Sequence, residues 1–583
     1  MQNQNYSENQ YRGNVRYTNY GENRCRRCDH KLSNSTKLYG PYCAQLLGLT
    51  ERGIPDEMID SLKEYMYSDK NKNFDTESGL EEPSYYIQNA AANYWLNSGE
   101  IKTRGQDILK INGLSLDDLS KNPELLKEYV EDLGGINTNS GLNSYQILYG
   151  AWDRPPMEYI NGGMVYKPTG NNRYNNYEFT DTDALNYMIM TGGNSNIVLQ
   201  YRDVQNLTDS EGNPDIEGMK NISAEWQADV MNKMLKAYEI LLQFGFPVQK
   251  PKFYVGAVEG MPETLVGIRK VRNGSEVNDY DYDRNAAEKG ILDLVLDKLK
   301  GNRDVVAGVY FGEDNLYDDG FSRADIKEDE NDYTGLKRLG CISKVVHEDY
   351  GIKLLYMPFY QINGDDGAVD YFNRVSIAAN KKHKCEWGYR ALIDTSVFQP
   401  GTYYFEKGKG LDKNGMYELA SCINGWNRLQ RENANSQKTS TEMGFELEFD
   451  MGLVLGRDDE NYEVRSDEKR RKLKEYLQIA EGMLKADPST PIGLYSGGPN
   501  EQGFANPIRN SNTHNTGNYR VQDSWRSYTK DNGMPFDLGD DAFPGNVIYL
   551  ISDYIYRYLS PDKSISIKQY SPELYDFLNM YDK

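Results

Sequence analysis

The sequence lacks long apolar runs and an excess of basic residues. None of its uninterrupted apolar stretches approaches the roughly 18 residues of a membrane-spanning helix, so we expect no membrane span. The 583 residues include 66 basic and 88 acidic side chains, a formal net charge of −22, which argues against nucleic acid or an anionic membrane as the main partner. The start, MQNQNYSENQ, has neither a basic segment nor an apolar core, which predicts cytoplasmic synthesis without a signal peptide.

Cysteine and histidine are also scarce. Six cysteines are too few for a disulfide framework in a chain of this length, so a reduced compartment is expected. The four histidines include no HExxH spacing, which argues against a catalytic metal. Tyrosine, in contrast, occurs 47 times. Its flat ring and hydroxyl suit sugar stacking and protein contacts equally, so composition alone does not choose between them.

The pattern along the chain divides it into four parts. Residues 1–24 form an arm rich in Asn, Gln, Tyr and Gly, and residues 25–45 hold a cysteine cluster. Residues 46–155 have helical spacing, and a Pro- and Gly-punctuated stretch then leads into a strand–helix alternation over 156–583. An isolated polar arm cannot offset its own conformational entropy, so we expect residues 1–24 to dock on another copy in a homo-oligomer or lattice.

Eight predicted strands alternate with predicted helices in the last part. The strands are GMVYKP (163–168), NIVLQY (196–201), KFYVGAV (252–258), VVAGVYF (305–311), IKLLYMPF (352–359), ALIDTSVF (391–398), GFELEFD (444–450) and PIGLYSG (491–497). The clearest helical stripe is Leu473, Tyr476, Leu477, Ala480, Met483 and Leu484. This alternation predicts an α/β fold, a (β/α)8 TIM-type barrel with long loops. A doubly wound sheet is the competing architecture, but no Gly-rich nucleotide loop follows the first strand.

Acidic residues lie within or directly after two of these predicted strands. Active sites of such barrels lie at the C-terminal strand ends, which is where Glu313 and Asp314 follow the fourth strand. In MGFELEFDMG the alternation sends Glu446 and Glu448 to the inner face of the seventh strand, and Asp450 to its end. Carboxylates on strands four and seven, about 5 Å apart, would suit retaining glycoside hydrolysis. The alternative is a solvated rim or a buried ion-pair network.

Within the hydrolase hypothesis, each carboxylate has a role. Glu448 lies nearer the strand's C-terminal end than Glu446 and is the expected nucleophile, with Glu313 as the general acid/base. Further side chains at strand ends are candidates for contacting the substrate. These are Asp314, Tyr310, Tyr356, Tyr360, Asp394, Gln399, Asp450 and Tyr495.

Four segments in this order, GVYFGEDN, LLYMPFYQINGDDG, IDTSVFQPGTYYF and MGFELEFD, resemble a known family. It is an uncharacterised bacterial family, domain of unknown function 4855, frequent in spore-forming Firmicutes. The resemblance covers roughly residues 160–560. It implies a glycosidase-like (β/α)8 barrel of carbohydrate-active ancestry and maps the acidic motifs onto Glu313, Glu446 and Glu448. Many members look secreted, whereas this sequence lacks a signal.

The segment CRRCDHKLSNSTKLYGPYC resembles a short metal-binding knuckle of phage and bacterial proteins. The resemblance implies a chelating hairpin from Cys25 and Cys28, with Cys43 closing the site. Thiolates suit tetrahedral zinc, and His30 is the nearest candidate for the fourth ligand. Such a zinc ion would be structural. The alternative is a reduced hairpin without metal.

Three functions are therefore open. The first is a glycoside hydrolase that acts on a carbohydrate by a two-carboxylate mechanism. The second is a self-assembling structural protein, such as a spore-coat, surface-layer or crystal component, built on a degenerate glycosidase barrel and associated with the spore. The third is a sugar-binding module that has lost catalysis. Paired carboxylates in a tyrosine-lined pocket would favour the first.

Overall fold

The computed structural model describes the greater part of the chain after residue 106. The described residues are 107–108, 110–111, 113–139, 141–151, 157–160, 163–166, 179–202, 204, 207–209, 211–272, 280–285, 287–312, 334–360, 368, 371–372, 375–376, 382–385, 388–403, 411–432, 441–449, 453, 466–496, 545–560 and 565–579. The polar arm, the cysteine cluster and most of the expected helical region lie outside these ranges.

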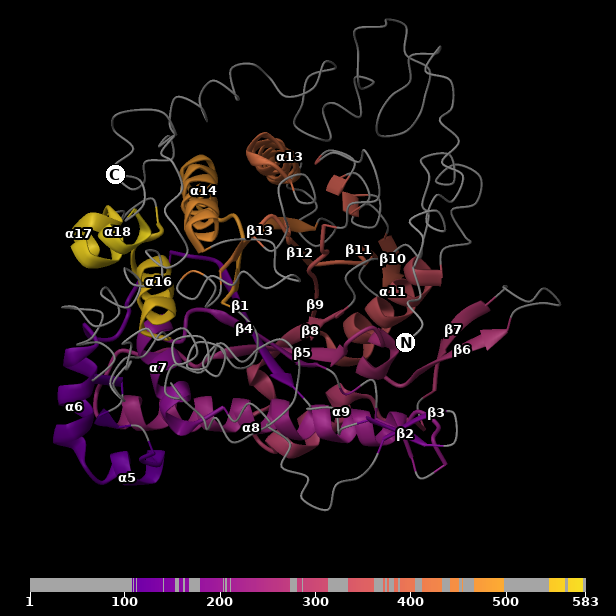
Figure 1. Ribbon diagram of the computed structural model, residues 1–583. Helices are drawn as coiled ribbons and strands as arrows, with labels where there is room; N and C mark the ends of the chain where they lie inside the picture. The colour runs from indigo at the N-terminus through magenta and orange to yellow at the C-terminus, as the bar shows by residue number, and fades with distance from the viewer. Residues whose placement is uncertain are drawn as a thin grey trace, which may run out of the picture.

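Eight parallel strands of the described residues close into a barrel (Figure 1). They are β1 (Ser144–Ala151), β4 (Asn196–Arg202), β5 (Lys252–Val258), β8 (Val306–Tyr310), β9 (Lys353–Tyr356), β12 (Thr395–Phe398), β13 (Glu442–Glu448) and β14 (Ile492–Tyr495). Each strand pairs with the next along the chain, and β1 pairs with β14 to close the ring. The predicted (β/α)8 TIM-type barrel is confirmed.

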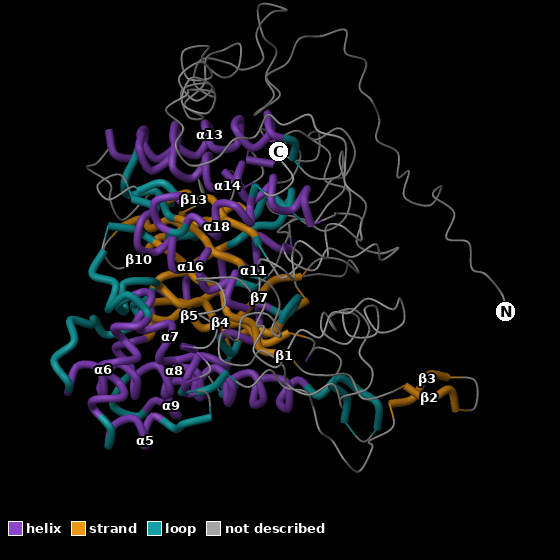
Figure 2. The backbone as a smooth tube through the Cα atoms, turned by 60° about the vertical axis from the view of Figure 1, so that its left-hand side comes forward, coloured by secondary structure: helices purple, strands orange, loops and turns teal. Residues whose placement is uncertain are grey.

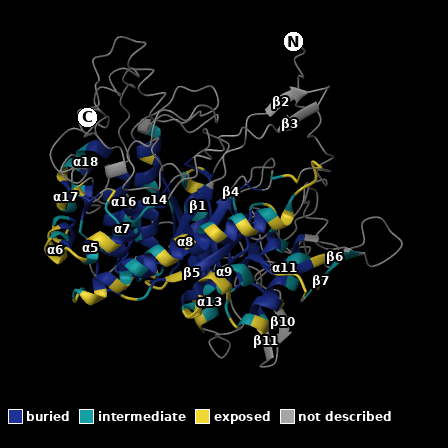
Figure 3. Cartoon of the chain, turned by 90° about the horizontal axis from the view of Figure 1, so that it is seen from below, coloured by how far each residue is buried: buried dark blue, intermediate teal, exposed yellow. Residues whose placement is uncertain are grey.

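Helices connect and cover the strands. They are α7 (Asp181–Thr191), α8 (Ile216–Gln243), α9 (Ile291–Leu299), α11 (Thr334–Val345), α13 (Lys413–Glu432), α14 (Ser466–Ala486) and α16 (Gly545–Tyr558). Figure 2 shows the strands between α13 and α14 on one side and α8 and α9 on the other. Buried residues fill the strands, while exposed residues follow the outer face of helices such as α8 (Figure 3). This is the arrangement that amphipathic helices around a parallel sheet require.

Shorter elements decorate this frame. Three antiparallel hairpins pair β2 (Met157–Ile160) with β3 (Gly163–Tyr166), β6 (Ile268–Arg272) with β7 (Tyr280–Arg284), and β10 (Lys382–Cys385) with β11 (Gly388–Ala391). The remaining helical elements are α5 (Leu116–Ser120), α6 (Pro123–Asp132), η2 (Pro262–Leu265), η3 (Arg303–Val305), the π-helix η4 (Val346–Tyr350), α17 (Ile567–Tyr570) and α18 (Pro572–Leu578). No helix among those described is long and apolar enough to cross a bilayer.

The expected first strand is a correction. Residues 163–166 form β3 of a hairpin, and the first barrel strand is instead β1, which begins at Ser144, before the boundary expected at residue 156. The outer face of β1 carries Gln146, whose amide donates to the carbonyl of Leu494 and whose Oε1 accepts from Tyr556 on α16. These partners satisfy a buried polar side chain that made the segment a poor strand by pattern.

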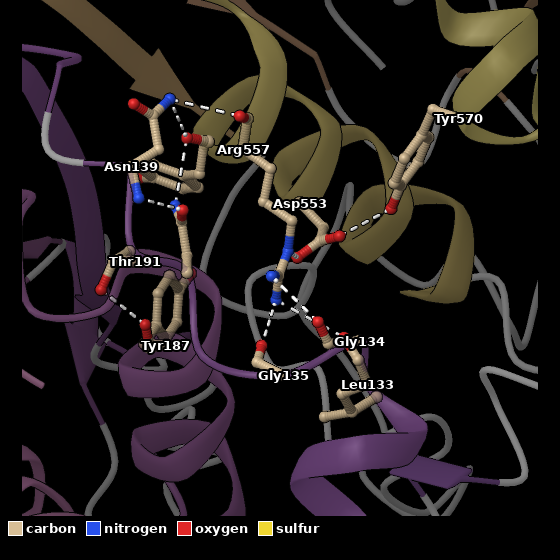
Figure 4. A network of polar contacts seen from close by, with 11 residues as sticks. Leu133, Gly134, Gly135, Asn139, Tyr187, Thr191, Asp553, Arg557 and Tyr570 are labelled. Carbon is tan, nitrogen blue, oxygen red and sulfur yellow. Dashed lines mark hydrogen bonds and ion pairs between the residues drawn. The ribbon is translucent and has the colours of Figure 1, made fainter. Parts of the chain in front are cut away.

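The segment after α6, before the barrel, is bonded to α16, a helix that follows the last barrel strand. Arg557 on α16 donates to the carbonyls of Gly134 and Gly135, just after α6, at 3.3 and 2.7 Å (Figure 4). Asp553 accepts from Arg557 at 2.6 Å and from Tyr570 at 2.7 Å. Arg557 therefore satisfies carbonyls of the turn that follows α6 and ties this turn to α16.

Candidate functional site

The barrel interior is lined by tyrosines among aliphatic residues. The inner cluster consists of Tyr145, Ile147, Tyr149, Val198, Tyr254, Tyr310, Leu355, Met357 and Val397, with Tyr495 packed against it. Near the N-terminal strand ends, Tyr145 lies edge-on to Tyr254 with ring centroids 5.6 Å apart. Near the C-terminal ends, Tyr149 lies edge-on to Tyr495 at 5.5 Å. The interior is therefore aromatic at both levels.

Strand β13 contributes two carboxylates to this interior. Phe445 and Leu447 point into the outer core, so the alternating Glu446 and Glu448 take the inner face, as expected. Both are buried, with 1% and 2% of their surface exposed. Carboxylates this deeply buried are uncommon unless they are held by partners.

Glu446 occupies space that a glycine leaves open. It pairs across the sheet with Gly493 of β14. A Cβ atom at Gly493 would lie 3.2 Å from Cγ of Glu446 and 2.7 Å from Cγ1 of Val397. The glycine therefore permits the Glu446 side chain to lie against the inner residues of the neighbouring strands.

Glu448 lies at the C-terminal end of β13 and has neutral donors on both of its oxygens. Tyr476 on α14 donates its hydroxyl to Oε2 at 2.5 Å, and the N–H of Gly401 donates to Oε1 at 3.2 Å. Burial raises the pKa of Glu448 to about 7, while the bonds from Tyr476 and the backbone of Tyr403 and Gly401, with the charge of Lys472, oppose that rise. The carboxyl group therefore titrates near neutral pH.

Positive charge approaches the same corner from α14. Lys469 places Nζ 4.7 Å from the ring centroid of Tyr403, a cation–π contact, and both side chains are buried. Lys472 lies one turn further along the helix, where burial lowers its pKa. Both lysines belong to the first part of α14, the helix that also carries Tyr476.

The structure places the candidate tyrosines differently from one another. Tyr310 and Tyr495 end β8 and β14 on the inner side, as the hypothesis requires. Tyr356 and Tyr360 belong instead to the outer core and not to the inner cluster, and their expected substrate contact stays a prediction. Leu355 of β9 and Met357, which directly follows the strand, take inner positions. Tyr356 between them points outward against Phe311, with ring centroids 5.9 Å apart.

Gln399 has a structural use. It is buried after β12, and its amide donates to the carbonyl of Met357 at 3.2 Å. Its own carbonyl accepts from the N–H of Tyr360 at 3.0 Å and from the hydroxyl of Tyr371 at 3.1 Å. Gln399 therefore ties the ends of β9 and β12 together near Glu448.

Asp394 lies at the other end of the barrel, which corrects its expected place at the mouth. The strand begins at Thr395, so Asp394 precedes β12. Its carboxylate contacts Nε2 of His347 at 2.8 Å and Nη2 of Arg390 at 2.8 Å, and accepts from the N–H of Leu354 at 2.7 Å. Burial alone would raise its pKa, but His347 and Arg390 together lower it.

Several candidates lie outside the described residues. They are Glu313, Asp314 and Asp450 of the expected mouth, and Cys25, Cys28, His30 and Cys43 of the expected zinc site. Among the described residues, no group of three or more His, Cys, Asp or Glu side chains is arranged to hold a metal. Zinc binding and the role of Glu313 therefore stay predictions.

The sequence pattern did not reveal that Tyr476 contacts Glu448. Its place in the stripe of α14 predicted a core residue, and its ring does pack on Phe445, with centroids 5.7 Å apart. The hydroxyl, however, reaches Glu448. A tyrosine within an otherwise aliphatic stripe was the one available signal, since a buried phenol needs a polar partner.

The fold and these side chains define a TIM-type barrel with buried carboxylates at the C-terminal end of its seventh strand. No protein-family model matches the chain, and a search of curated proteins found no match. A solved structure that does match is the X-ray structure of the FeFe-hydrogenase maturase HydG from Carboxydothermus hydrogenoformans. It has a TM-score of 0.27 and 11% sequence identity, over 90% of this chain and 89% of that chain. The fold assignment rests on the strand topology itself.

Proposed function

We propose that this protein is a glycoside hydrolase that acts on a carbohydrate from the C-terminal end of its barrel. The observation that carries the proposal is Glu448, a buried carboxylate at the end of the seventh strand with a donor on each oxygen. Active sites of TIM-type barrels lie at this end. A carboxyl group with a strongly shifted pKa at such a place is a candidate catalytic residue.

The proposed mechanism uses Glu448 as the nucleophile of retaining hydrolysis. Hydrogen-bond donors on both oxygens stabilise its ionised form, which attacks the anomeric carbon as the leaving oxygen takes a proton from the acid/base. Water then cleaves the glycosyl ester and returns a proton to that acid/base. Glu313 is proposed for this second role from its position in the sequence, after β8.

The remaining inner residues fit a sugar. Tyr310, Tyr495 and Tyr149 bring aromatic faces and hydroxyls to the same end of the barrel as Glu448. Such rings stack on the apolar face of a sugar and bond its hydroxyls. Glu446 is a second proposed catalytic carboxylate, one strand repeat deeper.

The alternative proposal is a self-assembling structural protein, with the lattice formed through the N-terminal arm. It depends on residues 1–24, which lie outside the described residues. We therefore place the hydrolase first, because its principal residue is among those described.

The test uses a panel of 4-nitrophenyl α- and β-glycosides, whose good leaving group needs little help from an acid. Wild-type protein should release nitrophenolate from at least one glycoside, and Glu448→Gln should lower kcat/KM by about 10³-fold or more. Glu442→Gln is the matched control, because Glu442 begins the same strand at the opposite end. It should keep wild-type activity.

A second variant identifies the role of Glu448. Sodium azide can replace a missing nucleophilic carboxylate, so Glu448→Ala with azide should regain activity and form a glycosyl azide. No hydrolysis of any glycoside by the wild type, or full activity of Glu448→Gln, would overturn the proposal. Rescue without glycosyl azide would reject the nucleophile role.

A further inference from the structure

The hydroxyl of Tyr476 donates to Glu448, and the side chain of Thr402 and the backbone of Tyr403 also bond to this hydroxyl. The ring is fully buried between β13 and α14 and packs on Phe445. A phenylalanine would fill that space equally well, so packing does not account for the oxygen atom. The hydroxyl oxygen is instead explained by its hydrogen bond to Oε2 of Glu448, at 2.5 Å.

The opposite oxygen of Glu448 has a donor with an unusual backbone. Gly401 follows β12 and has φ +66°, the left-handed region that favours glycine. This conformation accompanies an N–H directed at Oε1, 3.2 Å away. The two donors therefore come from different elements, the turn after β12 and the helix after β13, and approach the two oxygens separately.

We propose that Tyr476 is a positioning residue, and that with Gly401 it forms a two-point clamp that fixes the carboxylate of Glu448 for attack. The inference rests on the proposed function, and it adds α14 to the site. A single bond would leave the carboxylate free to rotate about its last torsion. Two donors on different elements fix both the plane of the group and the direction of its free lone pairs.

The clamp also acts on the charge of Glu448. A donor bond to a carboxylate stabilises the ionised form, so the hydroxyl of Tyr476 opposes the effect of burial. Among the described residues, Lys472 and the backbone of Tyr403 also favour the ionised form, and Lys469, Glu446 and Tyr371 lie at the same corner. These groups stay in place when the hydroxyl alone is removed.

The experiment is a titration of Glu448 in Tyr476→Phe. Glutamate labelled with ¹³C at the side-chain carboxyl gives the titration curve, and the resonance that Glu448→Gln removes is that of Glu448. Loss of one donor to a charged group should raise the midpoint by about one to two pH units above the wild-type value. Tyr554→Phe is the control, since this buried hydroxyl of α16 donates to the carbonyl of Ile565 at 3.0 Å.

A second variant reverses the expected sign. Substituting 3-fluorotyrosine at position 476 makes the phenol a stronger donor while the ring stays in place, so the midpoint of Glu448 should fall. This also covers the case in which Tyr476→Phe does not fold. An unchanged midpoint in the folded variants, or the same shift in Tyr554→Phe, would overturn the inference.

The two proposals fail separately. The titration needs no substrate, so a shifted midpoint with no glycoside hydrolysis would support the clamp and reject the hydrolase. Hydrolysis with an unshifted midpoint would do the reverse. Where both hold, the rising limb of the kcat–pH profile of Tyr476→Phe should move by the same amount as the titration midpoint, with KM little changed.

Discussion

The two ends of the barrel treat a buried carboxylate in opposite ways. At the N-terminal end, Asp394 lies between His347 and Arg390, and its pKa is lowered. At the C-terminal end, Glu448 is held by a phenol and a backbone N–H, and burial raises its pKa to about 7. One carboxylate is kept ionised by charge, whereas the other is balanced between its two states.

The opposite pKa shifts of Asp394 and Glu448 suit two different roles, one in stability and one in chemistry. A permanently ionised group bonded to three elements stabilises the fold but cannot exchange protons near neutral pH. A group that titrates near neutrality costs stability when it is ionised, and such a cost is expected where a reaction needs the group. This matches the division of TIM-type barrels, with stability at the N-terminal face and catalysis at the C-terminal face.

Removal of Asp394 should have the largest effect on stability. Asp394→Ala leaves Arg390, His347 and the N–H of Leu354 without their shared acceptor, part-buried at the base of the barrel. We expect a loss of about 3–4 kcal/mol in the free energy of unfolding. Urea denaturation followed by tryptophan fluorescence measures it, and glycosidase activity under native conditions should persist.

A surface ion pair supplies the control for this change. Asp297 contacts Lys289 at 2.7 Å, with both side chains half-exposed or more. Asp297→Ala should leave the free energy of unfolding almost unchanged, because solvent screens an exposed pair. Equal losses in the two variants would contradict the view that the buried network fastens this end of the barrel.

The same contrast shows why the sequence predicted the fold better than the site. Seven expected strands match barrel strands, because buried parallel strands are apolar runs between helices. β1 was missed because SYQILYGA precedes the Pro- and Gly-punctuated stretch from which the strand–helix alternation was expected to begin. The partner that satisfies Gln146, Tyr556, lies 410 residues further along the chain. No local pattern carries such a contact.

The site depends on details finer than the pattern. The segment ALIDTSVF does not show at which residue the strand begins. Asp394 could therefore not be assigned to the N-terminal or the C-terminal end of β12. A shift of one residue reverses the face of a strand, and Tyr356, a candidate chosen only for its place at a strand end, lies on the outer face. Glu446 and Glu448 were placed correctly because three acids at every second position of an apolar strand fix its register.

The pH dependence of stability sharpens the comparison. The pKa of Glu448 rises from 4.5 unfolded to about 7 folded, so between these values the native state binds more protons than the unfolded state. Stability contributed by the neutral form is complete below pH 4.5 and is lost as the pH rises to about 7. Relative to Glu448→Gln, the wild type should therefore lose about 3 kcal/mol across this window.

Asp394 should show the opposite sign in acid. Its pKa is lowered, so its contribution is complete above its unfolded value of 3.8 and is lost as the pH falls through the folded value. Denaturation midpoints of wild type, Glu448→Gln and Asp394→Ala from pH 3 to 8 separate the two. A flat difference between wild type and Glu448→Gln from pH 4.5 to 7 would contradict the role assigned to burial.

The smallest expected effect tests the space around Glu446. In Gly493→Ala the added methyl group would lie 2.7 Å from Cγ1 of Val397, 3.1 Å from Cε of Met357 and 3.2 Å from Cγ of Glu446. Such overpacking costs about 1–3 kcal/mol, and Met357 is the neighbour best able to move. Gly340→Ala on α11 is the matched control, because no atom lies within 4 Å of its added methyl group, and alanine should stabilise the helix by up to about 1 kcal/mol. The displaced Glu446 lies one strand repeat below Glu448, so Gly493→Ala should also lower activity, whereas a destabilised variant with full activity would place Glu446 outside the site.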